Sequence, residues 1–142
     1  MMVPDVNLLV YAYNADAPDH VCAKAWWESA LNDGPPVGLA WAVMCGFIRL
    51  MTHARVVVKP LSPSECVSHV RAWLACPGVE ILLPGARHLD ILGRLLGESG
   101  VAGALTTDAH LAALAIEHQA ELHSNDSDFG RFSGLRWVDP LA

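Results

Sequence analysis

The residues of this sequence best suited to chemistry are three aspartates far apart along the chain, Asp5, Asp108 and Asp126. Carboxylates that come close together repel, and each raises the pKa of the others unless a cation neutralises them. Mg²⁺ and Mn²⁺ suit such all-oxygen sites, keep open water positions and are normally shared with substrate phosphate. A site of this kind can activate water for in-line attack on a phosphodiester. The three aspartates therefore predict a divalent metal site for phosphodiester chemistry, provided that the fold brings them together.

Short apolar runs alternate with segments of helical spacing. The first predicted strand ends at Asp5, and the others cover residues 37–40, 79–83, 121–124 and 136–138. The predicted helices cover residues 7–14, 20–31, 41–52, 63–76, 87–98 and 107–119. Alternating strands and helices require crossover connections, which produce a parallel sheet covered on both faces. We therefore expect an α/β fold, an α/β/α sandwich with a short central parallel sheet, built as one domain over residues 1–142.

This fold prediction sends the three aspartates to one end of the sheet. Ligands of such sheets bind beyond the carboxyl ends of the strands. Asp5 stands where the first strand should end, and Asp126 lies two residues beyond the penultimate one. Asp108 falls in the first turn of the helix that leads to that strand, with Thr106 or Thr107 as the expected cap.

Each aspartate also has a purely structural interpretation. Asp108 could serve only the helix dipole, and Asp126 could be an ordinary turn residue. Asp5 is harder to explain in this way, because apolar neighbours surround it in sequence and an unpaired buried carboxylate is costly. The metal interpretation rests on the three acids taken together.

Composition excludes several classes of protein. With 53% hydrophobic and 17% charged residues, the 142-residue chain is not intrinsically disordered. A net charge of −6 argues against a stably bound, sequence-specific nucleic-acid reader, which would carry a basic face, but not against an enzyme that meets phosphate through a metal. The longest uncharged run, residues 34–48, contains prolines and glycines and is too short to span a bilayer. The chain starts without a basic signal-peptide region, so we expect a cytoplasmic protein with no membrane partner.

Other reactive side chains give weaker signals. The four cysteines include no C-x-x-C pair, and the seven histidines show no close metal-binding spacing. Trp26 and Trp27 occupy adjacent positions of a predicted helix, so one ring should face solvent or a partner.

Four segments resemble PIN-domain proteins, and most closely the VapC toxins of VapBC toxin–antitoxin modules. They are VPDVNLLVYA at 3–12, WAVMCGFIRLMT at 41–52, DAHLAALAIEH at 108–118 and SNDSDFGRF at 124–132. The resemblance covers nearly the whole chain. It implies a toxin that is a Mg²⁺- or Mn²⁺-dependent endoribonuclease, usually a homodimer, which acts on RNA and is inhibited by a cognate VapB-type antitoxin.

The resemblance also implies roles for individual residues. The aspartates at positions 5, 108 and 126 match the family's metal-binding and catalytic acids. Asp128 matches an additional acid often present there. Asn7 and Ser124 match polar supports of the site.

One position departs from the family pattern. A glutamate commonly stands in the third helix directly before the F/V-L-R-x-x-T pattern, and here that position is Gly46. Glu117 is a poor substitute, because nine residues after Asp108 it lies on roughly the opposite face of the helix. Asp128 is the better candidate. Two functions remain open: an active endoribonuclease toxin, or a catalytically weakened PIN-like module that binds RNA or antitoxin without chemistry.

Overall fold

A five-stranded parallel sheet forms the centre of the protein, in the order β3-β2-β1-β4-β5. The computed structural model describes residues 1–100 and 103–142. The strands are β1 (Met2–Pro4), β2 (Val37–Ala40), β3 (Val79–Leu82), β4 (Glu121–His123) and β5 (Arg136–Val138). The predicted strands are all present, and those of β2 and β5 have the predicted bounds.

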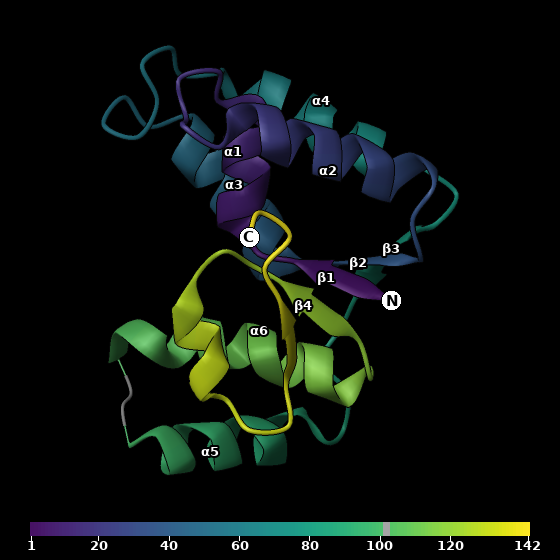
Figure 1. Cartoon of the computed structure of the whole chain (residues 1–142), viewed down its shortest axis with the longest axis vertical. Helices are drawn as coiled ribbons and strands as arrows, with labels where there is room; N and C mark the ends of the chain where they lie inside the picture. The colour runs from purple at the N-terminus through teal and green to yellow at the C-terminus, as the bar shows by residue number, and fades with distance from the viewer. Residues whose placement is uncertain (101–102) are drawn as a thin grey trace.

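Helices cover both faces of this sheet. They are α1 (Val6–Tyr13), α2 (His20–Asn32), α3 (Trp41–Met51), α4 (Pro63–Leu74), α5 (His88–Ser99) and α6 (Thr106–Glu117), with short 3-10 helices η1 (Gly103–Leu105) and η2 (Ser127–Arg131). Helices α1 to α4 lie on one face, and α5 and α6 lie on the other (Figure 1). The predicted α/β/α sandwich is confirmed.

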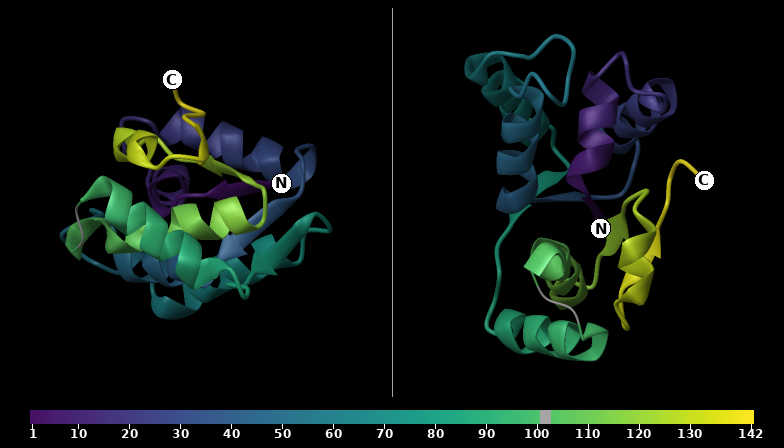
Figure 2. Two further views of the ribbon diagram at one scale, coloured as in Figure 1. Left: turned by 90° about the horizontal axis from the view of Figure 1, so that it is seen from below. Right: turned by 90° about the vertical axis from the view of Figure 1, so that its left-hand side faces the viewer.

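The strand order reverses direction beside β1. The chain builds β1, β2 and β3 outward to one edge, then returns through α5 and α6 to place β4 on the other side of β1 (Figure 2). Ligands of open parallel sheets bind at such a reversal, beyond the carboxyl ends of the strands. Pro4 pairs with His123, so the next residues, Asp5 and Ser124, leave the sheet side by side.

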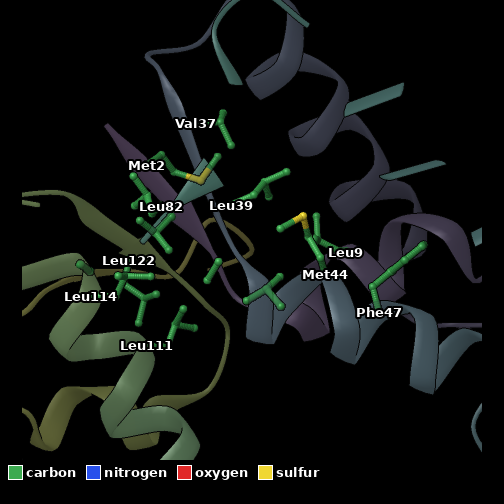
Figure 3. Close-up of a cluster of buried hydrophobic side chains, with 14 of the residues drawn as sticks. Met2, Leu9, Val37, Leu39, Met44, Phe47, Leu82, Leu111, Leu114 and Leu122 are labelled. Carbon is green, nitrogen blue, oxygen red and sulfur yellow. The ribbon is translucent and has the colours of Figure 1, made fainter. Parts of the chain in front are cut away.

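Apolar side chains from the sheet and from both helical layers meet in one core (Figure 3). Leu39 of β2 and Leu122 of β4 are fully buried, and all four residues of β2 are buried and apolar, as expected for a strand covered on both faces. Helices contribute Leu9, Met44, Phe47, Leu111 and Leu114. None of the helices in the described part of the chain is long and apolar enough to cross a membrane.

The predicted cap of helix α6 was wrong. Helix α6 begins at Thr106 with Leu105 as its N-cap, so neither Thr106 nor Thr107 caps it. The reason is η1, which runs directly into α6: Leu105 already has a helical backbone (φ −90°, ψ −1°), whereas a side-chain cap needs an extended residue there.

Helix α4 starts as predicted and offers a test of its stability. Ser62 and Glu65 form a capping box: the Ser62 hydroxyl accepts from the Glu65 N–H at 3.2 Å, and the Glu65 carboxylate accepts from the Ser62 N–H at 3.2 Å. We expect Ser62→Ala to lower the free energy of unfolding by about 1 kcal/mol, measured by urea denaturation. The exposed mid-helix Ser68→Ala should cause no loss, and an equal loss in both variants would contradict the capping role.

Candidate metal and catalytic site

Asp5 joins the first strand to the first helix. Its N–H donates to the His123 carbonyl at 2.9 Å, and its Oδ1 accepts from the Val6 N–H at 2.8 Å as the N-cap of α1. The residue is only 7% exposed. Burial raises the pKa of the Asp5 carboxyl group, while the hydrogen bonds from Ser124 and Val6 oppose the rise. Asp5 is therefore a buried acid held in place by both β1 and β4.

Ser124 connects two of the acids. Its hydroxyl donates to Asp5 Oδ2 at 2.7 Å and accepts from the Asp126 N–H at 3.0 Å. The residue is fully buried, and its backbone N–H donates to the Val138 carbonyl of β5. One hydroxyl thus fixes the Asp5 carboxylate relative to the chain that carries Asp126.

The segment after β4 turns back toward the site through η2. Asp126 is the N-cap of η2, where its Oδ1 accepts from the Asp128 N–H at 2.9 Å. Asp128 in turn forms a partly exposed ion pair with Arg131, with 3.2 Å between Oδ1 and Nη2. Arg131 therefore neutralises part of the charge of the fourth acid.

Asp108 completes the cluster from the other helical layer. Burial raises the pKa of its carboxyl group to about 6, and the charges of Asp5, Asp126 and Asp128 add to the rise. Asp5 also experiences the charge of Asp126. Asp5 after β1, Asp108 in α6 and Asp126 after β4 therefore lie near enough at the reversal of the strand order for their charges to affect one another.

The other residues singled out from sequence lie around this cluster. Asn7 is half-buried in the first turn of α1. Gly46 faces the first turn of α1: a Cβ at Gly46 would lie 3.2 Å from Cγ2 of Val6, the neighbour of Asp5. A side chain at position 46 would thus start beside the residue that follows the first acid.

Glu117 lies outside the cluster, as its helical position predicts. Its carboxylate accepts from the Gly85 N–H at 2.7 Å and the Arg87 N–H at 3.0 Å, just before α5. Both hydrogen bonds lower the pKa of the Glu117 carboxyl group, and the bond from Gly85 contributes most.

Two histidines that sequence reasoning left without a role also link α5 to α6. His88 Nε2 lies 2.9 Å from His110 Nδ1, and His88 is buried. No signal in the sequence spacing could have paired residues on two separate helices.

The donor chemistry of the cluster fits Mg²⁺ or Mn²⁺, since all its acids are carboxylates. Burial contributes most to the raised pKa of Asp108, and repulsion from the other acids adds to it; a cation would relieve that repulsion. Among the described residues, however, no three His, Cys, Asp or Glu side chains are arranged to hold an ion by themselves. Hydrogen bonds from Ser124, Val6 and Asp128 already engage the carboxylates of Asp5 and Asp126. An ion bound here would therefore need oxygen ligands from substrate phosphate or water as well, as is usual for Mg²⁺ sites shared with phosphate.

Comparison with known proteins decides the family. The sequence model of the PIN domain matches residues 2–135. The chain is 47% identical over 141 residues to Ribonuclease VapC33 of Mycobacterium tuberculosis, covering 99% of both chains. This chain belongs to the PIN-domain family and to its VapC branch. It is also 42% identical over 142 residues to Ribonuclease VapC37 of the same organism, covering 100% of this chain and 99% of the relative.

Solved structures of VapC relatives share the fold of this VapC-family chain. The VapBC2 structure of Rickettsia felis, bound to a promoter DNA fragment, superposes with a TM-score of 0.69 at 19% identity, covering 96% of each chain. VapC20 of Mycobacterium tuberculosis, described as a toxin that cleaves the sarcin–ricin loop, superposes with a TM-score of 0.68 at 18% identity, covering 96% of this chain and 99% of that one. At such identities the likeness shows the fold alone.

Crowding of the acids predicts a measurable cost in stability. The folded state disfavours the charged form of Asp108, so Asp108→Asn should raise the free energy of unfolding at about pH 8 in EDTA, by on the order of 1 kcal/mol because solvent screens part of the repulsion. The gain should shrink as the pH falls below about 6 and vanish below the ordinary value of 3.8.

A matched control separates crowding from the helix dipole. Asp90 occupies the same first-turn position in α5, and it is exposed. Asp90→Asn should lose a few tenths of a kcal/mol through the dipole. Equal losses in both variants, measured by urea denaturation across pH, would refute the crowding of Asp108.

Proposed function

We propose that this protein is the toxin component of a VapBC-type module and cleaves RNA phosphodiester bonds as a Mg²⁺- or Mn²⁺-dependent endoribonuclease. The observation that carries the proposal is the gathering of Asp5, Asp108 and Asp126 at the strand-order reversal, where they repel one another. The names of its relatives, ribonucleases of the VapC family, support the same activity.

Each residue of the cluster has a distinct task in this proposal. Asp5, Asp108 and Asp126 hold the metal and are the catalytic acids. A bound divalent ion stabilises charge on the phosphate and lowers the pKa of a bound water. Ser124 orients the Asp5 carboxylate through its 2.7 Å hydrogen bond, and we assign a supporting role to Asn7 in the first turn of α1. Asp128, two residues after Asp126, adds negative charge that acts on Asp108.

We further propose that a VapB-type antitoxin inhibits the protein. An arginine-bearing segment would form charge-assisted hydrogen bonds with an acidic cluster and compete with the metal. Structures of related proteins in VapBC complexes are consistent with such a partner. The homodimer and the cytoplasmic location belong to the same proposal.

Gly46 favours a second candidate, a PIN-like module that binds RNA or antitoxin but turns over slowly or not at all. The family's usual helix-α3 acid is missing at a position whose side chain would point toward Val6, next to Asp5. With one carboxylate fewer, metal affinity of the free protein should be weak, and substrate phosphate would complete the shell.

Cleavage of RNA distinguishes the two candidates. We expect the wild-type protein with Mn²⁺ to cut a fluorescently labelled RNA, and EDTA to abolish cutting. Asp5→Asn and Asp108→Asn should each lower the rate by more than about 100-fold, because ligand loss costs more than loss of an outer-shell partner. Asp90→Asn, purified identically, should cut at the wild-type rate. Cutting that survives Asp5→Asn would indicate a contaminating nuclease, and binding without cutting would favour the second candidate.

A glutamate restored at position 46 should strengthen metal binding. We expect Gly46→Glu to bind Mn²⁺ roughly tenfold more tightly than the wild type by isothermal titration, because it adds a charged oxygen ligand near Asp5. Gly46→Gln controls for the tight contact with Val6 and for the helix propensity of the new side chain. If the glutamate and glutamine variants bind Mn²⁺ equally, position 46 does not reach the metal.

A further inference from the structure

A pocket of about 340 Å³ opens between α2, the loop before β2 and the strands β1 and β4. Small-molecule sites begin at about 300 Å³, so the pocket is large enough for a small ligand. It lies outside the acid cluster. Its lining residues are Met2, Trp26, Ser29, Ala30, Gly34, Pro35, Glu121 and His123.

Two stacked rings form one wall of this pocket. Trp26 lies parallel to His123, with 6.0 Å between ring centroids and 24° between planes. Its neighbour Trp27 is 2% exposed and belongs to the core, whereas Trp26 is half-buried. This arrangement confirms the expectation that one of the two adjacent indoles is left for solvent or a partner. Aromatic faces at a half-open pocket are the usual stacking surface for unpaired RNA bases.

Polar groups stand at the edge of the same pocket. Glu121 and His123 are two residues apart on β4 and so point to the same face of the sheet. His123 Nε2 lies 3.4 Å from Glu121 Oε1, and the Glu121 side chain is 46% exposed.

The charges of the residues that line the pocket determine which ligands it can bind. It includes one carboxylate and neither lysine nor arginine, so it does not suit a phosphate group. A carboxylate instead accepts N–H groups, and its two oxygens match two parallel donors. Among the RNA bases, guanine alone presents two adjacent N–H donors, at N1 and N2, on its Watson–Crick edge. Uracil places carbonyl oxygens on both sides of its single N–H, which a carboxylate repels.

The pocket and the acid cluster share one strand. Ser124, which bonds Asp5, follows His123 directly in the chain, and Glu121 lies three residues before it, about 10 Å along the strand. A short stretch of single-stranded RNA spans such a distance. We therefore propose that the Trp26–His123–Glu121 pocket binds a guanine base of the RNA substrate near the cleaved phosphate. The assignment rests on the proposed function, since it takes RNA as the substrate.

Binding of a nucleoside tests the pocket without any need for catalysis. We expect guanosine to shift the indole N–H signal of Trp26 in a ¹⁵N NMR titration, with the signal assigned through Trp26→Phe and that of Trp41 unchanged. Trp41 is 54% exposed and lies at the start of α3, away from the pocket, so it serves as the internal reference. Inosine, which lacks only the N2 amino group, should bind roughly tenfold more weakly, because one of two paired hydrogen bonds is lost.

Variants test whether Glu121 is the carboxylate that distinguishes guanosine from inosine. Glu121→Gln should weaken guanosine binding roughly tenfold and remove the difference between guanosine and inosine. Glu80→Gln, an exposed glutamate of the edge strand β3, should behave as the wild type. Equal affinities for guanosine and inosine in the wild-type protein, or no shift at Trp26, would overturn the proposed guanine pocket, and the comparison of the two nucleosides needs no variant. Metal-dependent RNA cleavage would stand in either case, so failure of the pocket is distinguishable from failure of the nuclease.

Discussion

The crowding of negative charge beside β1 and β4 is the constraint on which this structure depends. Asp5 is buried, Asp108 has a raised pKa, and the charge of Asp126 acts on both of these acids. Such an arrangement costs stability, so the surrounding chain must hold it in place. The Ser124 hydroxyl does so most directly, because it satisfies a carboxylate oxygen and a backbone N–H at once.

A second set of polar contacts fixes the helix that carries Asp108. Glu117 near the end of α6 holds the backbone just before α5, and His118 binds the Leu83 carbonyl at 2.9 Å. His88 and His110 join the same two helices nearer to Asp108. These contacts anchor the long connection from the edge strand β3 back to the middle of the sheet. The connection from β3 to β4 thereby brings Asp108, which lies in the layer of α5 and α6, to the carboxyl ends of the strands.

Strand β4 unites the two sites of the molecule. Its carboxyl end leads into Ser124 and Asp126, and its outward face carries Glu121 and His123. The aspartates that we propose as catalytic acids match the pattern that this sequence shares with VapC toxins, whereas Gly46 departs from that pattern. In these proposals, one short segment positions both the acids at the strand ends and the base-recognition pocket on the strand face.

Periodicity and local signals determined the order of strands and helices along the chain, the start of α4 at Pro63 and the position of each aspartate near an element boundary. They depend on residues a few positions apart, which is why they can be read from the chain. The cap of α6 was predicted wrongly, because η1 sets the backbone of Leu105 before Thr106 begins the helix. Only the tertiary structure decided the double hydrogen bond of Ser124, the pairing of His88 with His110 and the pocket beside Trp26. Each of these joins groups from separate elements, and their contact depends on how the layers pack around the sheet.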